Sequence, residues 1–179
     1  MLDAGPHPPM GSAIATTQAV VLRSDLHDRL LDTALARFPT KTFGYLLAEE
    51  SRFEPVDFVI FDENIRNDSG WRPRFEAYGE YFVRHSDAGF VATAEEAWAV
   101  HQEIARRGLA EVAVFHTHQR HAANFSRIDY ELHLRMFESL WHLIVSLRNP
   151  CYPRLRAFDV TSSGVRELPL IVGDHDASR

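Results

Sequence analysis

Two histidines, a serine and an aspartate are spaced so that they could hold a metal ion and use it for hydrolysis. They are His116, His118, Ser126 and Asp129, within the stretch EVAVFHTHQRHAANFSRID. Two imidazoles and one carboxylate suit Zn²⁺, and three protein ligands leave the fourth tetrahedral position open for water. A hydrolytic zinc site requires such an open position.

The residues before the first histidine predict the strand that carries both of them. Residues 111–115 are mostly Val, Ala and Phe, which is typical of a buried strand. Side chains two positions apart on a strand point to the same face. His116 and His118 can therefore face one metal ion while Thr117 points away.

The aspartate is expected on a helix that follows a short loop. Residues 121–125 are small and polar and predict the loop, and Ser126 is suited to cap the helix that follows. Asp129 then falls in the first helical turn, where its carboxylate can turn toward the histidines and complements the helix dipole. Capping alone is an alternative explanation for Ser126 and Asp129, and histidine pairs on strands are common without a metal.

The spacing H-T-H, seven residues and then S-x-x-D resembles the JAMM motif of the MPN-domain metalloproteases. The resemblance covers roughly residues 20–170. Outside the motif it rests on Arg37–Pro39 before Gly44–Leu47, similar to the family's first helix and second strand, and on Trp141–Leu147 and Leu155–Val160, similar to its closing strands.

The resemblance implies both an activity and a set of roles. Members of the family cleave isopeptide and peptide bonds next to ubiquitin or ubiquitin-like proteins. By resemblance, His116, His118 and Asp129 would bind zinc, and Ser126 would hydrogen-bond the developing oxyanion. The implied substrate is an amide: an isopeptide or peptide bond after a ubiquitin-like tail, or a smaller amide conjugate.

One position departs from the family pattern. The family places a general-base glutamate just ahead of the second strand, in a pattern like P-x-E-x-x-G, and the matching stretch PTKTFG has Lys41 there. A protonated lysine cannot accept a proton from water, and a cation beside Zn²⁺ is electrostatically unfavourable. A milder departure is Gln119, where many members carry proline.

Three explanations for Lys41 remain open. A carboxylate from elsewhere could act as the base, with Glu76 and Glu80 in PRFEAYGEYF, or Glu49 and Glu50, as candidates. Metal alone could activate the water, because bound zinc lowers its pKa to about 7. The protein could also have lost proteolysis.

Two rival functions follow from these features. Lys41 favours a non-proteolytic MPN scaffold that recruits a partner. The aromatic-rich segment 71–82 favours a small-molecule amidohydrolase, in which this segment would wall the substrate groove. His133, one helical turn beyond Asp129, is a candidate to support that aspartate, and His121 is a further candidate ligand.

Composition narrows the class of protein. The 179 residues are 45% hydrophobic, which predicts one packed domain. A net charge of −6 without a basic cluster argues against nucleic acid as the main partner. The lone Cys151 fits a reducing cytoplasm. Neither a membrane span nor a secretory signal is evident.

The pattern of elements predicts an α/β domain with a mixed sheet between helices, the MPN-like, cytidine-deaminase-like fold. We expect a flexible arm over 1–17, the domain over 18–172 and a loose tail over 173–179. Predicted helices cover 24–38, 93–108 and 126–140, and the 64–89 segment is predicted as a long loop over an aromatic cluster. The other predicted strands are 19–22, 43–48, 56–61, 142–148, 155–160 and 165–171. The oligomeric state stays open.

Overall fold

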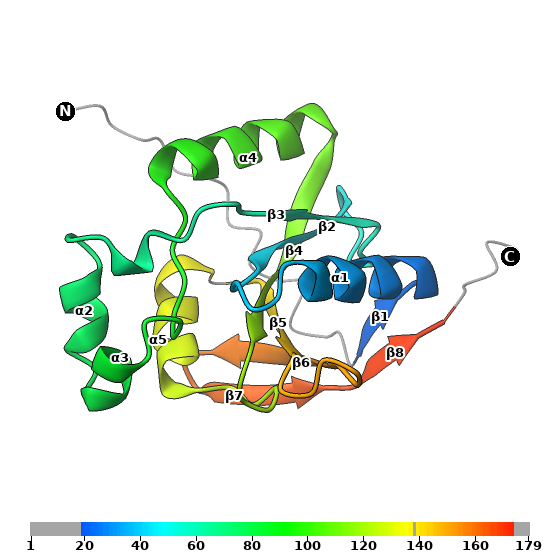
Figure 1. The fold of residues 1–179 in the computed structure, drawn as a ribbon. Helices are drawn as coiled ribbons and strands as arrows, with labels where there is room; N and C mark the ends of the chain where they lie inside the picture. Colours follow the sequence, from blue (N-terminus) through cyan, green and yellow to red (C-terminus); the bar gives the residue numbers. More distant parts are fainter. Residues whose placement is uncertain (1–18, 138, 174–179) are drawn as a thin grey trace, which may run out of the picture.

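A mixed sheet of six strands lies at the centre of the computed structural model, which describes residues 19–137 and 139–173 (Figure 1). The strand order is β3-β2-β4-β5-β6-β7. Of these pairs, β4 and β5 run parallel and the rest antiparallel. The strands are β2 (Phe43–Glu49), β3 (Asp57–Ile60), β4 (Leu109–His118), β5 (Trp141–Ser146), β6 (Arg154–Thr161) and β7 (Gly164–Leu168).

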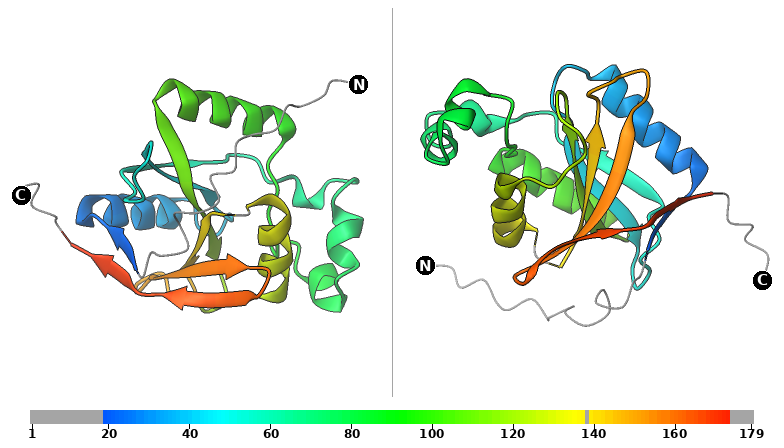
Figure 2. Two further views of the ribbon diagram at one scale, coloured as in Figure 1. Left: turned by 180° about the vertical axis from the view of Figure 1, so that it is seen from behind. Right: turned by 90° about the horizontal axis from the view of Figure 1, so that it is seen from below.

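Helices cover both faces of this sheet. Helix α1 (Ser24–Ala36) lies on one face, and α4 (Ala94–Arg106) and α5 (Arg127–Met136) lie on the other (Figure 2). Leu26, Leu30 and Ala34 of α1 are buried at four-residue spacing, as the periodicity predicts for an amphipathic helix. The predicted α/β fold with a mixed sheet flanked by helices is confirmed.

The strands of the sheet divide their side chains between the two faces. Leu46 and Phe115 belong to the core under α1, whereas Tyr45 and Val114 pack with Ile104 of α4. His116 stands two residues beyond Val114 on β4, so it points to the face that α4 and α5 cover. The metal-site face is therefore the one with two helices.

A proline divides the last predicted strand. β7 ends at Leu168 and β8 (Leu170–Val172) begins after Pro169, whereas the sequence predicts one strand over 165–171. Proline has no N–H to give to a strand ladder. Beyond it, β8 leaves the main sheet and pairs in parallel with β1 (Val20–Leu22).

The segment predicted as a long loop contains three short helical elements. These are the 3₁₀ turn η2 (Ile65–Asn67), α2 (Arg72–Glu76) and α3 (Glu80–Arg84). The buried Arg66 ties them together, because its guanidinium donates to the carbonyls of Ala88 (2.8 Å) and Phe82 (2.6 Å). The sequence prediction missed this buried cation, since arginine is mostly exposed.

The three predicted helices all end earlier than predicted, α4 by two residues at Arg106. Helix α1 ends at Ala36 and leaves Phe38 41% exposed, and α5 ends at Met136 rather than at residue 140. Thr93 caps α4 by accepting from Glu96 N. The Glu96 carboxylate accepts from the backbone N–H of Glu63 (3.2 Å), so Thr93 and Glu96 do not form a reciprocal capping box.

Two predictions concern residues outside the described part of the chain. The arm over 1–17 lies there entirely, and so does all of the 173–179 tail except Gly173, whose N–H donates to Leu22 O at 3.1 Å. None of the helices in the described residues has the length and apolar composition needed to cross a membrane.

Candidate metal site

The two histidines and the aspartate converge where β4 ends and α5 begins. The Nε2 atoms of His116 and His118 are 2.9 Å apart, and Asp129 Oδ1 and Oδ2 lie 3.3 Å and 3.6 Å from them, respectively. Tetrahedral zinc with Zn–N bonds of about 2.0–2.1 Å separates neighbouring ligand atoms by roughly 3.3 Å. One ligand atom from each residue therefore lies at a spacing that fits a metal ion.

A hydrogen bond on the far side of the His118 ring determines which of its two nitrogens carries the proton. His118 Nδ1 lies 2.9 Å from the carbonyl oxygen of Ala122. A carbonyl can only accept a hydrogen bond, so Nδ1 carries the proton and the neutral ring keeps a lone pair on Nε2. That lone pair points toward His116 and Asp129, as a metal ligand requires.

Asp129 is held by the cap of α5. Its Oδ2 accepts from the Ser126 hydroxyl (2.6 Å) and from Ser126 N (3.0 Å), and the hydroxyl accepts from Asp129 N (3.2 Å). The two residues thus form a capping box. Capping leaves Oδ1 directed at His116 (3.3 Å from its Nε2), so the capping carboxylate could also bind a metal ion.

Burial and charge act against each other on Asp129. Burial alone would raise the pKa of its carboxyl, but His116 and His118 more than offset this and hold the pKa well below its usual value. Asp129 is 3% exposed and is an anion in the neutral range. A buried anion between two imidazoles is a favourable setting for a divalent cation.

Two further buried histidines stand behind His116. His116 Nδ1 lies 2.8 Å from His142 Nε2, and His142 Nδ1 lies 3.0 Å from His133 Nδ1. Burial lowers the pKa of His142 well below its usual value, and lowers those of His116 and His133 to about 4 despite opposing effects of Asp129 and Asp159. The sequence pattern points to His133 as a support for Asp129, whereas the structure places it against His142. The sequence prediction did not identify His142. The available signal was its position on β5, the strand that pairs with β4, which carries His116 and His118.

Lys41, at the position where the resemblance predicts a glutamate, lines the same cavity as His118 and Asp129. The chain just after it pairs with β4, since Thr42 N donates to Thr117 Oγ1 (2.9 Å). Lys41 Nζ lies 5.9 Å from the centre of the Phe90 ring. Burial lowers the Lys41 pKa, and the negative charges of Asp129 and Asp87 partly oppose this.

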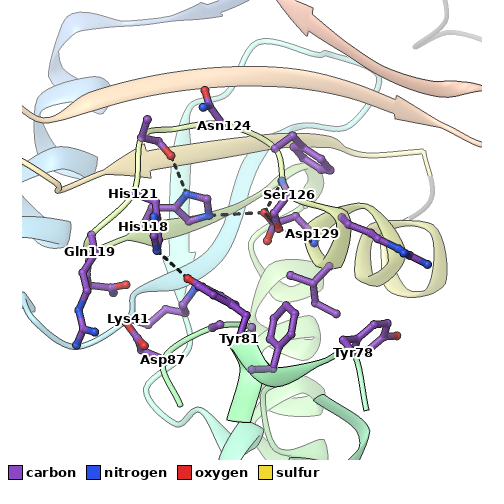
Figure 3. Close-up of a pocket in the computed structure, with 18 of the residues that line it drawn as sticks. Lys41, Tyr78, Tyr81, Asp87, His118, Gln119, His121, Asn124, Ser126 and Asp129 are labelled. Atoms are coloured by element: carbon purple, nitrogen blue, oxygen red, sulfur yellow. Dashed lines mark hydrogen bonds and ion pairs between the residues drawn. The ribbon is translucent and has the colours of Figure 1, made fainter. Parts of the chain in front are cut away.

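A cavity of about 980 Å³ opens in front of these residues. Figure 3 shows His118, Ser126 and Asp129 along one side and Lys41, Tyr81 and Asp87 along the other. The aromatic segment was expected either to cover a cluster or to wall a groove, and it does both. Phe75 is buried beneath the segment, whereas Tyr78, Tyr81 and Phe82 line the cavity.

The glutamates proposed as substitute bases lie elsewhere. Glu76 is paired with Arg72 and Glu80 with Arg84, and neither lines the cavity. Glu49 pairs with the first residue of β4, about 20 Å along the strand from the histidines, and Glu50 follows it. The carboxylates that do line the cavity are Asp87 and Asp129.

The two remaining candidates from the sequence also have defined places. His121 lines the cavity, and its Nε2 lies 2.7 Å from the Tyr81 hydroxyl rather than within the ligand group. Gln119, at the position where many family members have proline, is buried and donates from Nε2 to Thr117 Oγ1 at 3.0 Å.

A comparison with protein families gives this arrangement a context. The family described as prokaryotic homologs of the JAB domain matches residues 23–159, well over half of the chain. The chain belongs to this family. The JAB family contains both peptidases and members that are not enzymes, so membership alone does not assign a reaction. No curated protein matches the chain significantly.

Solved structures share the JAB fold at low sequence identity. Protein DSY2949 from Desulfitobacterium hafniense is 21% identical with a TM-score of 0.62, and the match covers 89% of this chain and 99% of that one. A protein from Salinibacter ruber is 21% identical with a TM-score of 0.55, covering 88% and 95%. A JAB1/MPN domain protein from Archaeoglobus fulgidus is 14% identical, covering 87% and 99%, with a TM-score of 0.47.

Proposed function

We propose that this JAB-family protein is a zinc-dependent metallohydrolase of the JAMM type that cleaves an amide bond. The observation that carries the proposal is the convergence of His116, His118 and Asp129 within 4.8 Å at the edge of a cavity. Their donor set, two imidazoles and a carboxylate, is that of a catalytic zinc site with one open position. Zinc held there would polarise a carbonyl and lower the pKa of water to about 7.

In the proposed reaction, Ser126 would stabilise negative charge on a substrate. It lines the cavity next to Asp129, and its hydroxyl donates to Asp129 Oδ2 at 2.6 Å. Rotation about its side-chain bond would aim the hydroxyl at the carbonyl oxygen of a bound amide. A donor held ready in this way stabilises an oxyanion as it develops.

The proton acceptor differs from that of the family pattern. Asp87 lines the cavity near Lys41, so it could take up a proton without any movement of the fold. Glu76 and Glu80 would have to leave their arginine partners and move with α2 and α3. We therefore rank Asp87 ahead of these two glutamates as the substitute base.

The proposed substrate is a protein or peptide with an isopeptide or peptide bond, next to a ubiquitin-like protein as the resemblance implies. The cavity wall adds a charge preference, because several cationic side chains line it in a protein of net charge −6. These are Lys41, Arg120, Arg127 and Arg148. Such a wall attracts an acidic group beside the scissile bond. The proposed place of action is the cytoplasm, on the strength of the lone exposed thiol Cys151.

Elemental analysis of the purified protein tests the metal directly. We expect about one zinc per chain, and loss of that zinc in a His118→Ala variant. His101→Ala is the matched control, because His101 is an exposed histidine that pairs with Glu111 outside the site. A native protein that takes up no zinc, even when zinc is supplied, would contradict the proposal.

A non-proteolytic metal-binding scaffold is the second candidate, and Lys41 is the observation that favours it. A small-molecule amidohydrolase is the third, favoured by the tyrosines on the cavity wall. Zinc-loaded protein should be assayed against a ubiquitin-like fusion and against small N-acyl amino acids. Turnover of the fusion alone supports the protease, turnover of the small amides alone supports the amidohydrolase, and bound zinc with neither activity supports the scaffold.

A further inference from the structure

Three buried imidazoles form a continuous chain that starts at the metal site. The chain runs from His116 through His142 to His133, with N···N distances of 2.8 Å and 3.0 Å. All three residues have 0% relative exposure. Since burial disfavours the charged form of each ring, the three are neutral near pH 7 and each carries a single N–H.

When no metal is bound, the short contact between His116 and His118 determines which ring donates and which accepts in each hydrogen bond of this chain. His116 Nε2 and His118 Nε2 are 2.9 Å apart, and one of them must carry a proton at that distance. His118 has its proton on Nδ1, bound to Ala122 O, so the proton between the rings belongs to His116 Nε2. His116 Nδ1 is then an acceptor.

The remaining protons follow by elimination. If His116 Nδ1 accepts, His142 Nε2 must donate to it, and His142 Nδ1 must accept from His133 Nδ1. Every N–H in the chain then has an acceptor. Of the six ring nitrogens in this chain of histidines, His133 Nε2 is the one without a partner among the described residues, and in this state it is a lone pair.

Metal binding requires every hydrogen bond in this chain to reverse its donor and acceptor. A metal ligand presents a lone pair, so the proton of His116 must sit on Nδ1 and donate to His142 Nε2. His142 then donates from Nδ1 to His133 Nδ1, and the proton of His133 moves to Nε2. The chain holds three protons in both states. As the metal binds, the proton of His116 Nε2 leaves to solvent, the two hydrogen-bonded protons each move across to the neighbouring ring, and His133 Nε2 takes up one proton from solvent.

We propose that His142 and His133 are positioning residues for the metal site, forming a tautomer chain that reverses direction when a metal binds. This inference rests on the proposed function, because it takes His116 as a ligand. At the far end of the chain, His133 Nε2 is a buried lone pair when no metal is bound and a buried N–H when a metal is bound. The far end therefore reports metal occupancy through two intervening hydrogen bonds.

Long-range ¹H–¹⁵N NMR of the imidazole rings tests the reversal without any activity assay. In metal-free protein we expect the proton of His133 on Nδ1 and that of His142 on Nε2. After one equivalent of zinc we expect His133 protonated on Nε2 and His142 on Nδ1. If zinc binds and neither tautomer changes, the inference is wrong and the proposed function stands. If zinc does not bind at all, both fail.

Zinc affinity gives a second measurement that does not depend on spectral assignment. A His142→Phe variant removes the acceptor for His116 Nδ1–H, and we expect the zinc Kd to rise about 10- to 100-fold. His142→Gln retains a carbonyl acceptor and should recover part of that loss. His101→Phe, at an exposed histidine paired with Glu111, is the matched control and should bind as the native protein does. Equal affinity in His142→Phe and native protein would overturn the inference.

Discussion

The cavity has two walls, and they differ in how firmly their polar side chains are held. On the β4–α5 wall, His116 and Asp129 are buried, and each is fixed by hydrogen bonds from neighbouring elements. On the facing wall, the Lys41 side chain makes no hydrogen bond to any described residue, and Tyr81 is 43% exposed. The first wall carries a donor set that could hold a metal, whereas the second carries Lys41 at the position where the resemblance predicts a glutamate base. Binding and turnover can therefore be separated by experiment.

The largest effect is expected from the first wall. Asp129→Asn keeps the shape of the side chain and an oxygen that can accept from Ser126 N, but it removes the anion between the histidines. We expect zinc affinity to fall by about 10³-fold or more, beyond the roughly 10- to 100-fold typical of losing a supporting partner. Competition with a chromophoric chelator measures it. Asp87→Asn, on the facing wall, is the control and should change affinity little; native-like binding by Asp129→Asn would remove Asp129 from the ligand set.

The buried histidines of the first wall should also make the metal-free protein sensitive to acid. The pKa values of His116 and His133 are about 4 in the folded protein and about 6.5 in the unfolded chain. The unfolded chain therefore binds more protons below pH 6.5, so stability is full above that pH and declines as the pH falls toward 4. We expect the free energy of unfolding to drop by about 2 to 4 kcal/mol from pH 7 to pH 5.

Urea denaturation at the two pH values measures this drop. A His133→Phe variant should show a smaller decrease, because it removes one of the buried histidines whose pKa is lowered on folding. A free energy of unfolding that stays constant between pH 7 and pH 5 would show that these rings have ordinary pKa values. The histidines of the first wall would then be accessible to solvent in the folded protein.

The sequence allowed the first wall to be predicted better than the second. The strand, the loop and the cap around His116 to Asp129 are local features, set by alternation on a strand and by helix-cap chemistry. The second wall depends on where the 64–89 segment folds back against the domain. Arg66 decides that through carbonyl contacts with residues some twenty positions away, and no local pattern announces such contacts.

The same contrast explains why Glu76 and Glu80 lie away from the cavity and why His142 was missed. Glu76 and Glu80 lie close to the cavity-lining Tyr78 in sequence, but their short helices turn them toward Arg72 and Arg84. His142 lies on the strand parallel to β4, and its contact with His116 follows from strand order. Strand order in a mixed sheet is a tertiary property, so neither feature could be predicted from spacing alone.

Restoring the family residue on the second wall should recover turnover if proteolysis has merely lapsed. With zinc bound, Lys41→Glu supplies a carboxylate beside Asp129, and general-base catalysis contributes typically 10²- to 10⁴-fold. We expect a gain of about 10²-fold on a ubiquitin-like fusion, the lower end of that range. Lys41→Gln removes the cation without adding a base and should raise zinc affinity but not the rate. Equal rates for the two variants would show that Lys41 does not occupy the position of the base.

The smallest effect is expected where the two walls touch. Tyr81 of α3 contacts His121 of the metal-site loop through a 2.7 Å hydrogen bond at the exposed rim of the cavity. Tyr81→Phe should lower the free energy of unfolding by at most about 1 kcal/mol, the usual net contribution of one hydrogen bond. Zinc affinity should be unchanged, because His121 lies outside the ligand group. A several-fold loss of zinc affinity in this variant would instead make His121 part of the metal site. Tyr81 on the facing wall would then contribute to metal binding through its hydrogen bond to His121.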